Sequence, residues 1–119
     1  MIKFDTTYTN LDDYLLVSIS GQWTDYAAQE GIEEIKRKAE SYGKARVLLN
    51  LMNMIPPDSE MTRFRTGEYI AKMWRSLRVA AVWKQEFINK FTEDVAVNRG
   101  ARLAGFADEK QALKWLLPD

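Results

Sequence analysis

The sequence of 119 residues contains neither cysteine nor histidine. Without cysteine, the chain cannot form a disulfide, a zinc–thiolate site or a thiolate nucleophile. Without histidine, it lacks the commonest general base and the commonest transition-metal ligand of proteins. Its six glycines are not spaced as in the loops that hold phosphate groups. We therefore expect a non-catalytic protein with no metal site and no cofactor.

The chain also lacks an excess of either charge, since 17 Lys and Arg residues balance 17 Asp and Glu residues. A protein without a positive excess is poorly suited to general binding of nucleic acid or of anionic membranes. The opening segment MIKFDTTYTN lacks the apolar core of a signal peptide. No apolar run approaches the roughly 20 residues that span a bilayer. Because the absence of cysteine suits a reducing compartment, we expect a cytoplasmic protein.

Strand and helix patterns alternate along the chain. Strand patterns occur at 2–8, 14–21, 46–51, 77–83 and 102–106. Helical periodicity occurs at 28–42, 59–74 and 85–98, and again after the capping residue Asp108. The order β-β-α-β-α-β-α-β-α predicts a single α/β domain over residues 1–119, with a mixed, mostly parallel five-stranded sheet and about four helices.

The most informative stretch is RVLLNLMNMIPPDSEMTRFR, residues 46–65. Its apolar run, broken only by Asn50, is typical of a parallel strand that is covered on both faces. The two prolines that follow cannot continue a strand ladder and keep the chain extended. Asp58 is a good helix N-cap, so we expect Ser59 on the first helical turn, beside unpaired backbone N–H groups.

These segments resemble the STAS domains, and in particular the SpoIIAA-like group of anti-sigma factor antagonists. The resemblance extends over nearly the whole chain and rests on SGQWT after a strand, VLLNLMNM, the Asp58-Ser59 pair and the ending GFADEKQALKWLL. It implies a non-catalytic regulatory or protein-interaction module with a protein partner. Signalling members usually follow the Asp-Ser pair with small residues, whereas Glu60 and Met61 stand here. The ending resembles a SpoIIAA-like subgroup without an established activity.

Two interpretations of Ser59 remain open. As a phospho-switch, it would place a charge of about −1.5 to −2 beside a helix N-terminus, within reach of Arg63 one turn on. As a structural residue, it would simply help Asp58 and Glu60 to cap the helix. Basic residues recur along this segment and after it, at Arg63, Arg65, Lys72, Arg75 and Arg78, and three of them, Arg65, Lys72 and Arg75, lie near one helix face. They could contact an acidic partner or lipid headgroups, but we expect a solvated helix face.

A second candidate site lies at the carboxyl ends of the predicted strands, where open α/β sheets bind ligands. The residues at these ends that would line an apolar pocket are Trp23, Met54, Trp83, Gln85 and Phe106. Aromatic and methionine side chains suit a small apolar ligand or a lipid. The alternative is that both tryptophans close the ends of the core. Apolar stripes on the middle helices leave a homodimer open as well.

Overall fold

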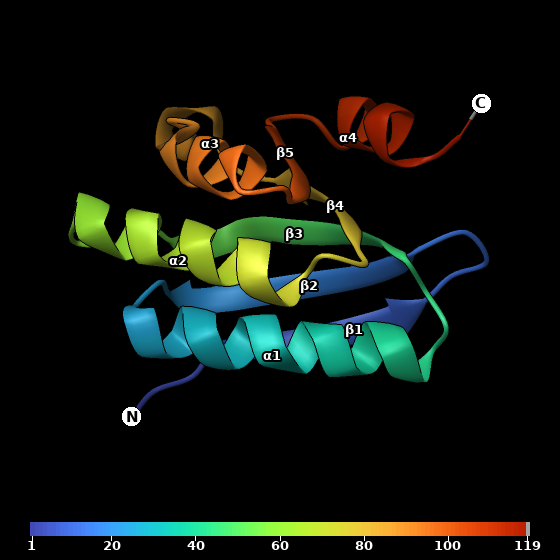
Figure 1. Cartoon of the computed structure of the whole chain (residues 1–119), viewed down its shortest axis with the longest axis horizontal. Coiled ribbons are helices and arrows are strands. Elements are labelled where there is room, and N and C mark those ends of the chain that lie inside the picture. The colour runs from blue at the N-terminus through green and yellow to red at the C-terminus, as the bar shows by residue number, and fades with distance from the viewer. Residues whose placement is uncertain (119) are drawn as a thin grey trace.

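The computed structural model describes residues 1–118, which contain one five-stranded sheet. The strands lie side by side in chain order: β1(Asp5–Asn10), β2(Leu15–Gln22), β3(Arg46–Ile55), β4(Arg78–Val82) and β5(Arg102–Phe106) (Figure 1). β1 pairs antiparallel with β2, and the other neighbouring pairs are parallel. The predicted α/β class, the mixed sheet and the order of elements are confirmed.

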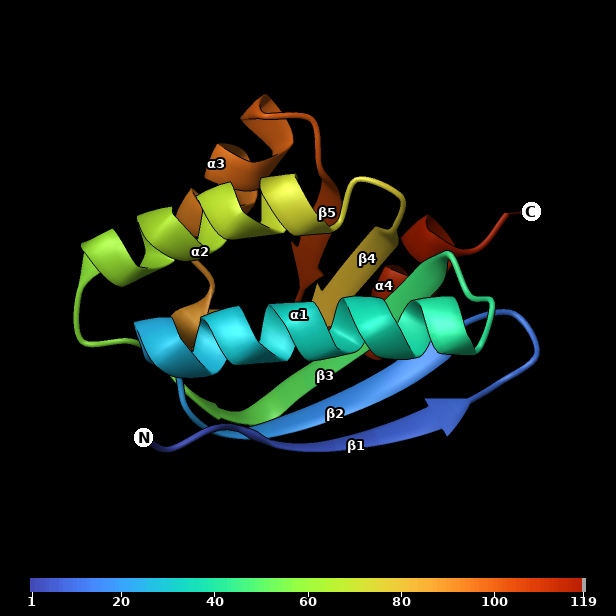
Figure 2. The same cartoon turned by 60° about the horizontal axis from the view of Figure 1, so that its bottom comes forward.

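Helices cover the two faces of the sheet unequally. The helices α1(Asp25–Ser41), α2(Glu60–Met73) and α3(Phe91–Asn98) lie on one face, and α4(Glu109–Leu116) lies on the other (Figure 2). Alternation along each strand explains this division. Val47 and Leu49 belong to the core under the three helices, whereas Leu48 between them packs with α4. Within residues 1–118, no helix has the length and apolar character needed to cross a membrane.

The close contact between α2 and α3 depends on Gly67. A Cβ atom at this position would lie 2.8 Å from the backbone oxygen of Thr92 and 2.8 Å from the Cβ of Val95. Real side chains do not approach so closely, so glycine lets the two helices meet. The Thr92 hydroxyl then donates a hydrogen bond to the backbone oxygen of Arg63 at 3.1 Å. The start of α3 is therefore fixed against the first half of α2.

Several element boundaries differ from the prediction, including β1, which covers Asp5–Asn10 rather than 2–8. β3 continues to Ile55 rather than ending at residue 51, because β2 goes on pairing beyond a register shift and Gln22 lies opposite Ile55. The single helix predicted at 85–98 is wrong, since a 3-10 turn, η1(Gln85–Phe87), is separated from α3. Lys90, between them, has a φ of 63°, which a continuous right-handed helix excludes.

Candidate functional site

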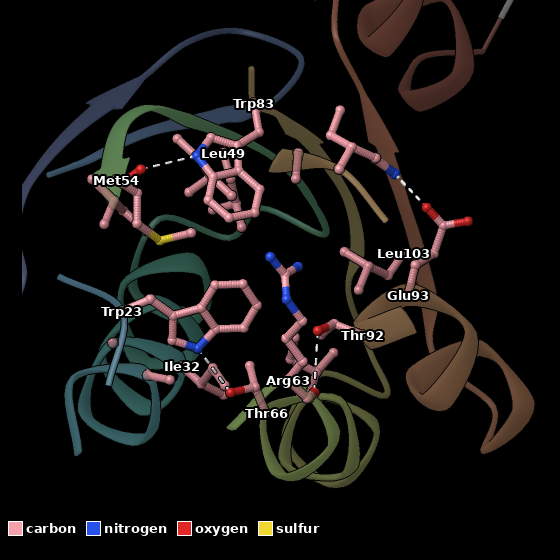
Figure 3. Close-up of a pocket in the computed structure, with 18 of the residues that line it drawn as sticks. Trp23, Ile32, Leu49, Met54, Arg63, Thr66, Trp83, Thr92, Glu93 and Leu103 are labelled. Atoms are coloured by element: carbon pink, nitrogen blue, oxygen red, sulfur yellow. Dashed lines mark hydrogen bonds between the residues drawn. The ribbon is translucent and has the colours of Figure 1, made fainter. Parts of the chain in front are cut away.

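A cavity of about 140 Å³ lies between the sheet and the layer formed by α1, α2 and α3 (Figure 3). Its walls are almost entirely apolar. Side chains from three elements that are far apart in sequence contribute to it, among them Leu49 of β3, Ile32 of α1 and Ile70 of α2. The cavity thus extends into the main core and is partly open to solvent.

Two tryptophans form the end of the cavity at the carboxyl ends of the strands. Trp23 follows β2 and Trp83 follows β4, and their ring centroids are 5.8 Å apart with an interplanar angle of 54°. The indole N–H of Trp23 donates to the Thr66 hydroxyl at 3.0 Å, and that of Trp83 donates to the backbone oxygen of Met54 at 3.0 Å. Because both polar atoms have partners, the two rings are fixed in position.

Both tryptophans are buried, with exposed fractions of 7% and 5%. They close the end of the core, as one interpretation of the sequence required. They also line the cavity together with Met54, as the other interpretation required. The two interpretations therefore describe the same geometry, and the rings are core residues that face an internal space.

Arg63 extends from α2 toward the space between the two indole rings (Figure 3). Its Cζ atom is 5.2 Å from the ring centroid of Trp23 and 5.5 Å from that of Trp83. Only 8% of the residue is exposed. The prediction that Arg63 lies on a solvated helix face is wrong. By contrast, Arg65 is exposed and pairs with Asp25 at 2.8 Å.

The polar partners of the Arg63 guanidinium are distant for a buried charge. It donates to the Asn89 side-chain oxygen and to the Phe87 backbone oxygen, both at 3.3 Å. Its Nε atom is 3.5 Å from a carboxylate oxygen of Glu60, whose side chain is 65% exposed. Charged N–H···O hydrogen bonds are typically about 2.7–2.9 Å long. Burial lowers the pKa of Arg63, and the charge of Glu60 only partly opposes this effect.

Ser59, and not Asp58, is the N-cap of α2. Its φ of −143° and ψ of 152° are extended, and its hydroxyl oxygen accepts a hydrogen bond from the Thr62 N–H at 3.3 Å. The prediction that Asp58 is the cap is wrong, because the chain stays extended for one residue more after the prolines. Both residues are exposed. Arg63 points into the core, so it does not provide the solvated cation that a phosphate on Ser59 was expected to meet.

Two of the residues expected at the ligand edge do not line the cavity. Gln85 is exposed at the start of η1. Phe106 pairs in register with Val82, which faces α4, and its ring packs against Trp115 with centroids 6.0 Å apart. Trp83 comes one residue after Val82 and therefore faces the other side of the sheet. The structure thus unites Trp23, Met54 and Trp83, and separates Gln85 and Phe106 from them.

The sequence did not indicate Arg63, Thr66 and Asn89 as members of this site. For Arg63 a signal was available, because it precedes Gly67 by four residues and Ile70 by seven, on the buried stripe of α2. Asn89 had none, since its position depends on the break before α3. Among residues 1–118, no group of three His, Cys, Asp or Glu side chains is placed to hold a metal ion.

Comparison with known proteins bears on the architecture. No protein-family model matches the sequence, and a search of curated proteins finds no significant match. Among solved structures, an uncharacterized DUF3478-family protein with a SpoIIAA-like fold from Shewanella loihica PV-4 is 19% identical with a TM-score of 0.63, covering 97% of this chain and 94% of that chain. The chain has the SpoIIAA-like fold. The STAS-like architecture predicted from the sequence is thereby confirmed.

Two further structures with the SpoIIAA-like fold are similar over nearly the whole chain. An anti-sigma factor antagonist from Mycobacterium paratuberculosis is 14% identical with a TM-score of 0.64, covering 96% of this chain and 94% of that one. The anti-sigma factor antagonist SpoIIAA in its unphosphorylated form is 14% identical with a TM-score of 0.53, covering 92% and 96%. At sequence identities this low, the structural similarity establishes a shared fold alone.

Proposed function

We propose that this chain is a non-catalytic binding module that holds a small apolar molecule in the cavity under α1 and α2. The observation that carries the proposal is an apolar space of about 140 Å³ that ends at two fixed tryptophans. An engineered cavity of about 150 Å³ in another protein binds benzene, so this volume accommodates roughly six carbon atoms.

The energetic cost of the cavity supports a role in binding. Apolar wall atoms that face an open space lack the packing contacts of a filled core, and this lowers the free energy of unfolding. A core selected for packing alone would fill such a void with larger side chains. Here small residues remain at the walls, such as Ala28 and Gly31 of α1 and Ala81 of β4.

A route to solvent lies at the segment before α3. Asn89 and Lys90 line the cavity and are exposed, so the cavity approaches the surface at these residues. This segment lies outside the regular helices, between η1 and α3. A molecule of a few carbon atoms therefore has a short path from solvent to the tryptophans.

The test is a thermal titration with two six-carbon probes, hexanamide and hexanoate. Either probe should raise the melting temperature of the wild-type chain, because a ligand that binds only the folded state stabilises it. The variant Ala28→Leu places a larger side chain in the cavity and should lose the effect. If neither probe binds the wild-type chain, the proposed function is wrong.

A second function is favoured by the surface around Asp58 and Ser59. We infer a regulatory protein–protein contact at this surface, with Ser59 as a modifiable residue. Both residues are exposed at the start of α2, and two proteins of the same fold are anti-sigma factor antagonists. A phosphate on Ser59 would lie near backbone N–H groups and the positive end of the helix dipole.

This surface and the cavity share the first turn of α2. The Glu60 carboxylate accepts a hydrogen bond from the Asn89 amide at 3.3 Å and faces the Nε of Arg63. The regulatory hypothesis predicts that Ser59→Asp and Ser59→Ala change the set of proteins that co-purify with the chain from its host. Unchanged partners in both variants would show that Ser59 is not a switch.

A further inference from the structure

We propose that the molecule bound in the cavity is a monocarboxylate, with its carboxylate on the Arg63 guanidinium and its apolar tail in the cavity. This inference rests on the proposed ligand-binding function. It adds the chemical class of the ligand and assigns a specificity-determining residue to the site.

Arg63 has weaker polar partners than other arginines of the chain. Arg78 donates to the Trp115 backbone oxygen at 2.7 Å, and Arg46 donates to the Leu116 backbone oxygen at 3.0 Å. Exposed Arg65 reaches a carboxylate at 2.8 Å. Arg63 is the most buried of these four residues, yet its hydrogen bonds are 3.3 Å long and end on neutral oxygens, and its ion pair with the exposed Glu60 is 3.5 Å long. It has capacity for a stronger acceptor.

Two indole rings lie close to the Arg63 guanidinium. The rings of Trp23 and Trp83 attract the cation, but they offer no oxygen to its N–H groups. A carboxylate has two coplanar oxygens that match the fork of a guanidinium. In the almost wholly apolar cavity, water competes weakly for such a pair. Two cations line the cavity, and since Lys90 is already paired with Glu93 at 3.5 Å, an incoming anion would meet Arg63.

A carboxylate at the wall of the cavity favours a ligand with a single negative charge. Glu93 also lines the cavity, and its carboxylate accepts from the Gly105 N–H at 2.7 Å and lies 3.5 Å from Lys90 Nζ. Its charge already has partners, and it would repel a second negative charge on a ligand. A phosphate or a dicarboxylate therefore fits less well than a monocarboxylate.

The volume limits the size of the tail. The space of about 140 Å³ resembles one that holds a six-carbon ring. Short aliphatic acids and aryl carboxylates have tails of this size, whereas the chain of a membrane lipid is much longer. The structure thus favours a small soluble acid over a lipid.

The experiment is calorimetric titration near neutral pH with hexanoate and with hexanamide, which has nearly the same shape and no charge. A charge-assisted hydrogen bond predicts that hexanoate binds about tenfold more tightly or better. Arg63→Met should reduce this preference to nearly one while the five-carbon tail still binds. The matched control is Arg65→Met, two residues along the same helix, which should leave the preference intact.

Each outcome has a distinct meaning. Equal affinity of the wild-type chain for the two probes would overturn the monocarboxylate assignment and leave apolar ligand binding standing. Binding of neither probe would overturn both proposals. A preference for hexanoate that survives in Arg63→Met would show that another cation recognises the carboxylate. Should Arg63→Met fail to fold, Arg63→Lys retains the charge without the fork and should show a reduced preference.

Discussion

Arg63 and Arg78 are two arginines that pack against indole rings at opposite ends of the sheet. Arg78 begins β4, and its Cζ atom is 3.8 Å from the ring centroid of Trp115 while its N–H donates to the backbone oxygen of the same residue at 2.7 Å. Arg46 donates similarly to the Leu116 oxygen. These oxygens belong to the last turn of α4, where backbone carbonyls lack partners within the helix. Arg78 thus completes the end of a helix.

Arg63 also lies beside indole rings, but its N–H groups make only long hydrogen bonds. Its rings are more than 5 Å away, its hydrogen bonds are long, and a cavity lies beside it. The role of an arginine beside tryptophan therefore depends on the oxygen atoms that accept its hydrogen bonds. Where the chain's own carbonyls accept at short distance, the role is structural. Where they do not, the guanidinium is available to another molecule.

The largest change in stability should come from removing the tryptophan ring beside each of the two arginines. Trp83→Ala removes a buried ring and its N–H donor, which should lower the free energy of unfolding by about 3–5 kcal/mol. Trp115→Ala removes a half-buried ring and should cost less, about 1–2 kcal/mol. Urea unfolding measures both values. Equal losses would mean that the cavity end is no better packed than the α4 side.

The two arginines should respond to methionine with opposite signs. Arg63→Met removes an incompletely compensated buried charge and should raise the free energy of unfolding by about 1 kcal/mol or more. Arg78→Met leaves the Trp115 carbonyl at the end of α4 without its donor and should lower it by about 1–2 kcal/mol. The same urea unfolding curves give both differences. Destabilisation by both variants would contradict the distinction between a structural and an available arginine.

A smaller effect tests the start of α2, from which Arg63 extends. Ser59→Ala removes the N-cap hydroxyl and should lower the free energy of unfolding by about 1 kcal/mol. Asp58→Ala is the matched control and should change it by less than about 0.5 kcal/mol, because Asp58 lies outside the helix. Thermal unfolding separates the two. A larger loss of stability in Asp58→Ala than in Ser59→Ala would show that Asp58 is the N-cap.

The smallest effect, visible only in alkali, concerns Tyr8 on the three-helix side. Burial, with the hydrogen bond that its hydroxyl donates to Glu34 at 2.7 Å, raises the pKa of Tyr8. The protonated form is therefore favoured in the folded state. This contribution to stability is complete below the unfolded pKa of about 10 and is lost as the pH rises above it.

Tyr8→Phe should flatten the alkaline limb of the stability curve relative to the wild-type chain. Tyr14 is the comparison on the other side, since burial is the main cause of its raised pKa and Glu109 and Asp13 add to it. A series of urea unfolding curves across the alkaline range measures the slopes. Identical slopes for Tyr8→Phe and the wild-type chain would show that Tyr8 titrates alike in both states.

Sequence patterns predicted the fold well and the site in part. Apolar alternation located the strands, and the rule that ligands bind at strand ends brought Trp23, Met54 and Trp83 together in advance. Phe106 was assigned wrongly because the face on which it lies depends on the strand register. Phe106 pairs with Val82, and the sequence alone does not reveal this register.

The error at Arg63 has a different cause. A charged residue on a helix is normally solvated, and that general preference outweighed its spacing from Gly67 and Ile70 on the buried stripe. The break at Lys90 depends on one left-handed residue, which no periodicity reveals. Composition and residue spacing thus predicted the fold, whereas the cavity depends on contacts between segments that are distant in sequence.

The most direct measurement is an NMR titration of the nitrogen-15-labelled chain with hexanoate, following the side-chain Nε–H signals of Arg63 and Arg78. Binding of a carboxylate at Arg63 predicts a saturable shift of the Arg63 signal and almost none at Arg78, which serves as the internal reference. A hexanoate-dependent shift at Arg78 alone, or saturable binding that leaves the Arg63 signal unmoved, would contradict the assignment of Arg63 as the ligand-binding cation.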